Sequence, residues 1–127
     1  MHIRTGIDLV EVSRVEKAIQ KQHFIDIVYT KKEQEYCNAR GKGRAASYAA
    51  RWAGKEAVVK AMETGLAGGA MTEIEILNDE AGCPQVTLYG SLAERAEGLG
   101  IKEISISMTH VKEYAAATCC MEEEKKE

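Results

Sequence analysis

The sequence predicts an α+β fold in which an antiparallel sheet packs against a long central helix. The first reason is the order of the hydrophobic patterns, which indicate a strand, then helices, then mostly strands. The second is an alanine-rich stretch without proline, residues 44–64, which is the clearest helix of the chain. Because the 127 residues show neither an internal repeat nor a domain boundary, we expect one domain over residues 1–127.

The N-terminal part predicts a strand followed by two helices. Residues 3–12, IRTGIDLVEV, have the composition of a strand, which Gly6 and Asp8 interrupt. Ser13 and Thr30 each have a glutamate three residues later, which is the spacing of a capping box. We therefore expect one helix to begin at each of these two residues, and the second to end before a Gly-Lys-Gly loop.

Glycines mark the central helix and the pattern changes after it. Gly65 is expected to end the helix. Gly54 costs about 1 kcal/mol inside a helix relative to alanine, so a close helix–strand approach or a ligand contact could require it. Beyond Gly65 we expect a hairpin, a helix that Gly100 ends, two strands joined by a turn, and a frayed charged tail. These elements fall at residues 72–77 and 85–90, 91–99, 104–109 and 114–121, and 122–127.

Charge is distributed unevenly along the chain. Residues 1–60 hold 12 Lys/Arg against 7 Asp/Glu, a net +5, and residues 61–127 hold 5 against 13, a net −8, which sum to −3. A basic half can steer an acidic partner to one face, although two ordinary solvated surfaces would give the same counts. We expect no nucleic-acid partner.

Cysteine usage and hydropathy predict a cytoplasmic protein. No secretory signal and no run of membrane-spanning length are visible, so the four cysteines are expected to be reduced. Cys119 and Cys120 are adjacent and should point to opposite faces of a strand, which argues against a shared metal site. We expect all four cysteines to pack in the core.

Two carboxylates are the first candidates for chemistry. Asp8 lies in an apolar strand segment, where an unpaired carboxylate is expensive to bury, so it either points to solvent or holds a hard metal such as Mg²⁺. Glu56 lies in the central helix among Arg51, Lys55 and Lys60. It forms either an ordinary ion pair four residues apart or a Mg²⁺ ligand beside cations that bind phosphates.

A hydroxyl-bearing strand is the third candidate. Ser105, Ser107 and Thr109 alternate onto one strand face, and His110 follows them. Hydroxyl groups bind phosphate oxygens and histidine can donate or accept a proton, but a solvent-facing strand would show the same residues. The chain contains no P-loop and no zinc-binding spacing.

Taken together, these features resemble the holo-[acyl-carrier-protein] synthases, the small stand-alone bacterial type of 4′-phosphopantetheinyl transferase. The resemblance rests on GIDLVEVSRV at 6–15, ARWAGKEAVVKAMETG at 50–65 and SISMTHVKEYAAATCCME at 105–122, and it extends over nearly the whole chain. It implies the 4′-phosphopantetheinyl transferase-like fold. It also implies Mg²⁺-dependent transfer of 4′-phosphopantetheine from coenzyme A to a serine of apo-acyl carrier protein, in fatty acid biosynthesis.

The resemblance also implies roles for residues. The metal carboxylates correspond to Asp8 and Glu56, which with Lys60 form the catalytic set. Which group takes the serine proton stays open between Glu56, another carboxylate and a metal-bound water. The coenzyme A-binding residues implied are Arg51, Lys55, Lys60, Gly65, Ser107, Thr109 and His110. The basic first helix, with Arg14, Lys17 and Lys21, is the implied docking face for the acidic carrier protein. The family further implies a homotrimer with active sites between subunits.

Two other functions fit the residues without the resemblance. A non-catalytic module could bind coenzyme A or an acidic protein through the basic half, and would not need both carboxylates. A different Mg²⁺-dependent phosphotransferase would keep the carboxylates and use another acceptor. Turnover of an apo-carrier protein distinguishes these alternatives from the transferase.

Overall fold

The computed structural model describes residues 1–124 and has five strands and five α-helices over that range. The elements, with two short 3₁₀ helices η1 and η2, are β1 (His2–Glu11), α1 (Val12–Ala18), α2 (Gln22–Val28), α3 (Lys31–Asn38), η1 (Gly41–Gly43), α4 (Arg44–Met62), η2 (Met71–Glu73), β2 (Ile74–Asn78), β3 (Pro84–Leu88), α5 (Gly90–Leu99), β4 (Ile101–His110) and β5 (Tyr114–Glu123). The predicted α+β class is confirmed.

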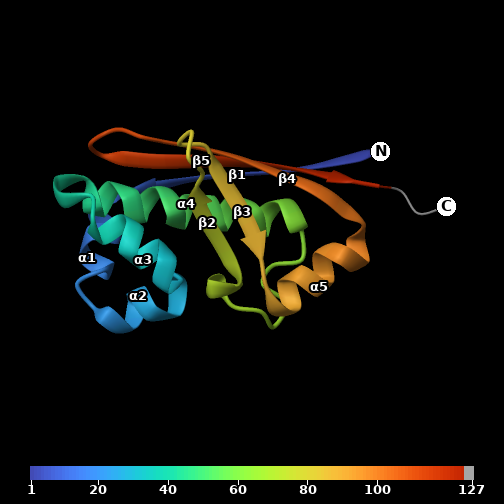
Figure 1. Ribbon diagram of the computed structural model, residues 1–127, viewed down its shortest axis with the longest axis horizontal. Coiled ribbons are helices and arrows are strands. Elements are labelled where there is room, and N and C mark those ends of the chain that lie inside the picture. The colour runs from blue at the N-terminus through green and yellow to red at the C-terminus, as the bar shows by residue number, and fades with distance from the viewer. Residues whose placement is uncertain (125–127) are drawn as a thin grey trace.

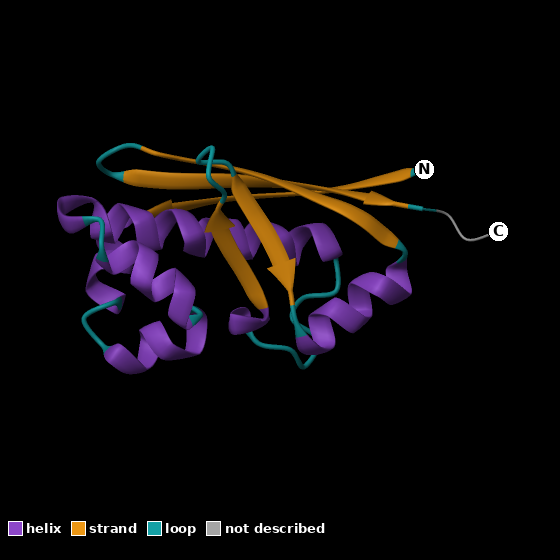
Figure 2. Ribbon diagram, viewed as in Figure 1, coloured by secondary structure: helices purple, strands orange, loops and turns teal. Residues whose placement is uncertain are grey.

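The long helix α4 lies against a three-stranded antiparallel sheet with the strand order β1–β5–β4 (Figures 1 and 2). The β2–β3 hairpin forms a second sheet that crosses α4, helices α1 to α3 gather at one end of α4, and α5 lies at the other. The sheet therefore has one face on α4 and an opposite, outer face. Side chains alternate between these faces, so the even-numbered residues Gly6, Asp8 and Val10 of β1 face α4.

Strand β1 and helix α4 touch through their backbones. A Cβ atom placed on Gly6 would lie 1.9 Å from the carbonyl oxygen of Ala57 and 2.8 Å from the amide nitrogen of Ala61. Helix α4 presents fully buried alanines at this contact, including Ala53, Ala57 and Ala61 at four-residue spacing. Small side chains on both elements thus let the strand lie directly on the helix.

Gly54 meets side chains instead of backbone. Its Cβ would lie 2.6 Å from a terminal methyl group of Ile76 and 3.1 Å from one of Ile106. The close helix–strand approach expected at Gly54 is therefore observed, against the two residues of β2 and β4.

The ends of α1 and α4 differ from the predictions. Helix α1 begins at Val12 without a capping side chain, because the Val12 amide donates to the carbonyl of Glu113 at 2.9 Å. The capping box expected at Ser13 is thus wrong, whereas the one at Thr30 is confirmed for α3. Helix α4 ends at Met62 and not at Gly65, because Glu63 takes the left-handed conformation. Arg4 stabilises this end by donating to the Met62 carbonyl and to the Glu63 carboxylate.

Helix α2 and the last two residues of β5 were not anticipated. Helix α2 has no capping side chain and only seven residues, so it gives little local signal. Strand β5 continues to Glu123, which pairs with Arg4 at 3.3 Å, so Glu122 and Glu123 are strand residues and not part of a frayed tail. Of the rest of that predicted tail, Glu124 donates its amide to the Gly100 carbonyl at 2.9 Å, and residues 125–127 lie outside the described residues.

The cysteines divide between core and surface. Cys119 and Cys120 point to opposite faces of β5 as expected, and Cys37 and Cys119 are buried. Cys83 and Cys120 are exposed, so the expected core role is wrong for these two. No helix within residues 1–124 is both long and apolar enough to cross a bilayer.

We expect Gly6→Ala to lower the free energy of unfolding by about 1–3 kcal/mol, because the added methyl group meets helix backbone that cannot turn aside. Gly54→Ala is the matched control. There only flexible methyl groups must move, and alanine gains about 1 kcal/mol of helix propensity, so the change should be small. Urea unfolding midpoints measure both. Equal effects of the two substitutions would contradict the backbone contact.

Candidate active site

Asp8 faces α4 from the edge strand β1. Its side chain is 16% exposed and pairs with Lys60, whose Nζ lies 3.2 Å from Oδ1. The register of β1 sets Asp8 opposite Ala117 of β5. The alternative that Asp8 simply points to solvent is therefore not what the structure shows.

Glu56 of α4 lies near Asp8, and both line one cavity. Partial burial raises the pKa of the Glu56 carboxyl above its ordinary value, the negative charge of Asp8 raises it further, and Lys60 lowers it. Two carboxylates that repel each other across a shared space form a place where a cation is favoured.

The cavity beside the two carboxylates has a volume of about 350 Å³ and is lined by both polar and apolar side chains. Val15, Phe24 and Trp52 contribute apolar side chains to this lining, and Arg14 stands at its rim. Phe24 and Trp52 pack together with their ring centroids 5.8 Å apart. The sequence reasoning missed these three apolar residues, although Trp52 lies four residues before Glu56 and so shares its helix face.

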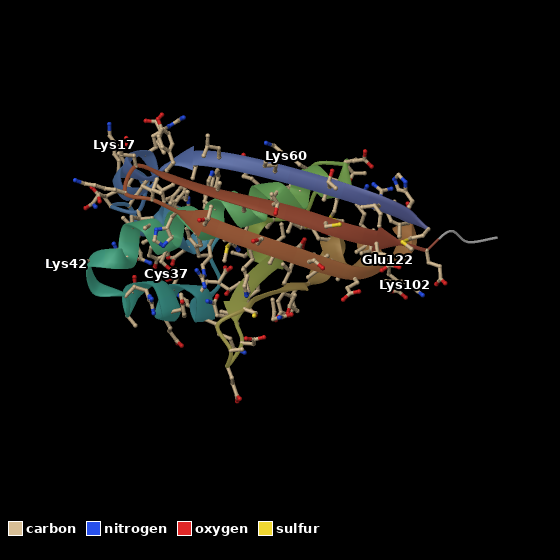
Figure 3. All side chains as sticks on the ribbon, turned by 90° about the horizontal axis from the view of Figure 1, so that it is seen from above. Lys17, Cys37, Lys42, Lys60, Lys102 and Glu122 are labelled. Atoms are coloured by element: carbon tan, nitrogen blue, oxygen red, sulfur yellow. The ribbon has the colours of Figure 1, made fainter. Side chains whose placement is uncertain are left out.

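Lys60 bridges the Asp8 carboxylate and the backbone of β1. Its ammonium donates to the Ile7 carbonyl at 2.9 Å and to Asp8 at 3.2 Å. The side chain is 53% exposed, and Figure 3 shows it beside the free edge of β1. Since an ammonium group has three N–H donors, one remains for an anionic ligand.

Lys55 and Arg51 do not face this cavity. Lys55 is fully buried. Its ammonium donates to the Glu33 carboxylate at 2.7 Å and to the carbonyls of Met71 and Ile74. Arg51 is 3% exposed, donates to Asn78 at 3.0 Å, and stacks over a tyrosine ring. Both charges thus have partners inside the fold, and the phosphate contacts expected of these two residues stay a prediction.

The hydroxyl-bearing strand lies partly elsewhere. Ser107 and Thr109 are exposed on the outer face of β4, opposite to the face that carries Asp8. Ser107 and Lys60 line one hollow of about 610 Å³. His110, at the end of β4, lines a separate groove of about 770 Å³ together with Lys42. Within one chain these residues do not converge on the two carboxylates.

Gly65 and the basic residues of the N-terminal helices lie at the surface. Gly65 follows the end of α4 with φ +62° and open space around it, so its backbone conformation and not packing requires glycine. Arg14 and Lys17 are exposed on α1, and Arg14 reaches the cavity rim. Lys21 was expected in the first helix but lies outside it, because α1 ends at Ala18 and Lys21 is the N-cap of α2.

The donor set suits a hard divalent cation held by few protein ligands. Within residues 1–124 no group of three or more His, Cys, Asp or Glu side chains is arranged to hold a metal. Asp8 and Glu56 offer two carboxylates beside an open cavity. Mg²⁺ commonly binds through one or two carboxylates and completes its shell with water and substrate phosphates, so the pair fits it.

Comparison with known proteins agrees with the sequence resemblance. The model of the 4′-phosphopantetheinyl transferase superfamily matches residues 4–119. The holo-[acyl-carrier-protein] synthase of Ruminiclostridium cellulolyticum is 44% identical over 92% of this chain and 90% of that protein. The holo-[acyl-carrier-protein] synthase of Moorella thermoacetica is 40% identical over 94% of each chain.

Solved structures show the same fold. The complex of the Chronobacterium ammoniagenes synthase with coenzyme A superposes with a TM-score of 0.85 at 26% identity, covering 98% of this chain and 100% of that one. The Neisseria meningitidis holo-[acyl-carrier-protein] synthase gives a TM-score of 0.86 at 28% identity, covering 94% and 98%. The predicted transferase-like fold is thereby confirmed, and the chain belongs to the 4′-phosphopantetheinyl transferase superfamily.

Proposed function

We propose that this enzyme transfers 4′-phosphopantetheine from coenzyme A to a serine of an apo-acyl carrier protein, with Mg²⁺ bound by Asp8 and Glu56. The observation that carries the proposal is the grouping of these two carboxylates and Lys60 at one cavity. The names of the relatives, and the coenzyme A bound to the Chronobacterium synthase, support the donor and the acceptor. The product of such a reaction serves fatty acid biosynthesis in the cytoplasm.

In this mechanism each residue has a physical task. Bound Mg²⁺ supplies charge neutralisation at the pyrophosphate of coenzyme A. Asp8 and Glu56 would hold the cation, and the remaining N–H of Lys60 would bind a phosphate oxygen as negative charge builds on the leaving adenosine 3′,5′-bisphosphate. The apolar side chains of Phe24 and Trp52 exclude water from the reacting groups.

We further propose that the outer face of the three-stranded sheet packs against neighbouring copies in a homotrimer. This face exposes large apolar side chains, with Ile7 and Leu9 each 66% exposed and Tyr114 45%. It also carries Ser107, whose side chain is on the opposite sheet face from that of Asp8 in its own chain. A neighbouring subunit would bring its Ser107 to the coenzyme A site, and its Thr109 and His110 with it.

Incubating the protein with coenzyme A, Mg²⁺ and apo-carrier protein, and weighing the carrier by mass spectrometry, tests the proposed reaction. We expect a mass gain of one phosphopantetheine group. Asp8→Asn and Glu56→Gln should each lower kcat by a factor of about 10²–10³, the loss typical of removing one charge-stabilising group. No modification of several carrier proteins by the wild type would refute the reaction, and near-normal turnover in either variant would refute the metal assignment.

Glu56→Gln should raise the melting temperature of the metal-free protein at pH 7 while it removes activity. A raised pKa means that the folded state favours protonated Glu56, so the ionised group destabilises the fold above that pKa. Below about pH 4 the group is protonated in both states, so the difference should vanish. Calorimetric scans across this pH range check the sign, and a lower melting temperature for the variant at pH 7 would contradict it.

Reversing charge on the N-terminal helices should weaken carrier binding. For Lys17→Glu with Lys21→Glu we expect a higher KM for the carrier, a weaker salt dependence and an unchanged KM for coenzyme A, because rim charges steer association. Lys102→Glu, on β4, is the control, and because it reverses one charge it is compared with each of the two substitutions made singly. A similar rise in carrier KM for the control would show that overall charge, and not this face, governs binding.

Ile7→Glu should disrupt the trimer and lower activity, since it buries a carboxylate in the proposed interface. Ile27→Glu, on α2, changes a residue of similar exposure at 53% outside that interface. Light scattering after size-exclusion chromatography gives the mass of each variant. A monomeric wild type, or a trimeric Ile7→Glu protein, would contradict the proposed assembly.

A further inference from the structure

A fully buried ion pair lies one residue from Glu56. The Lys55 ammonium and the Glu33 carboxylate are both 0% exposed, with Nζ 2.7 Å from Oε1. Lys55 also donates to the Met71 carbonyl at 3.0 Å and to the Ile74 carbonyl. The same ammonium therefore contacts α3, the η2 turn and the start of β2.

Glu33 completes the connection. Its Oε1 accepts the backbone amide of Thr30 at 2.8 Å, within the capping box of α3, and its Oε2 accepts the amide of Ile76 at 2.8 Å. Each oxygen thus has a partner, and each bond reaches a different element. The pair links helix α4 to α3 and to the β2–β3 hairpin through directional contacts, which an apolar pair would lack.

This geometry fixes the rotation of α4 about its axis. On one side Gly6 of β1 lies on the helix backbone, and on another Lys55 is held by Glu33 and two carbonyls. Glu56 follows Lys55 by about 100° around the helix. A rotation of α4 about its axis that broke the contacts of Lys55 would also move the Glu56 carboxylate away from Asp8.

Stability alone is a weak reason for such a pair. Desolvating two charges offsets much of their attraction, and apolar residues of similar volume often stabilise a core as well or better. Directional contacts, by contrast, distinguish one helix rotation from another. The pair is therefore better suited to setting a position than to holding the fold together.

We propose that Lys55 and Glu33 are positioning residues, which hold Glu56 opposite Asp8 and thereby set the affinity of the site for a divalent cation. This inference rests on the proposed function of the two carboxylates. It assigns to Lys55 an indirect role, distinct from the phosphate contact expected from the sequence.

The test replaces both partners and measures binding of Mn²⁺ alone by electron paramagnetic resonance, without coenzyme A. The double variant Glu33→Gln/Lys55→Met keeps side-chain size and removes both charges of the buried pair. We expect this variant to fold and to bind Mn²⁺ about 10-fold more weakly, because the loss of residues that position metal ligands typically lowers metal affinity by that factor. At saturating metal its kcat should recover. Tyr89→Phe is the control, because it removes a hydrogen bond to Glu75 that involves neither Glu33 nor Lys55, and it should leave the affinity unchanged.

The outcomes separate the two claims. A folded double variant with wild-type Mn²⁺ affinity would overturn the positioning role and leave the proposed reaction standing. A wild-type protein that binds Mn²⁺ no better than Asp8→Asn would overturn the metal site and the positioning role together. Should the double variant fail to fold, Glu33→Gln alone must show weaker Mn²⁺ binding, and wild-type affinity in that variant would equally contradict the inference.

Discussion

The direct contact between β1 and the backbone of α4 is the constraint on which the site depends. Gly6 permits it, because any side chain there would meet the Ala57 carbonyl. Asp8 follows two residues later on the same strand face, and Glu56 is the neighbour of Ala57 on the helix. The backbone contact thus sets the separation of the two carboxylates. Such a contact is more rigid than one made by flexible side chains.

Helix α4 divides its charged residues between two faces. Arg51 and Lys55 are four residues apart and share a buried face, where they contact Asn78 and Glu33. Glu56 and Lys60 are also four apart and share the face toward Asp8. Three cations that look equivalent in the sequence therefore have two different tasks. Two of them have partners in the interior, and Lys60 offers a donor to a ligand.

The sequence predicts much of this architecture, because α4, the hairpin and the outer strands have strong periodic patterns. The two carboxylates lie in the family-like segments 6–15 and 50–65. What it could not supply depends on distant partners. The start of α1 is decided by the carbonyl of Glu113, a hundred residues along the chain. The burial of Lys55 depends on Glu33, which local spacing identifies only as a capping residue. Similarly, Ser107 and Asp8 lie on opposite sheet faces because of a strand register that becomes known only from the structure.

The pairing of β1 also has a consequence for the order of folding. Its strand partner is β5, so residues 2–11 find their hydrogen bonds at residues 114–123. During synthesis on the ribosome, the segment that carries Asp8 emerges early and stays without a strand partner until β5 has left the exit tunnel. Contacts so distant along the chain carry a large loop-closure entropy and slow the search for the native state. The strand that carries Asp8 is therefore expected to complete its pairing late, after the helices, whose contacts are local.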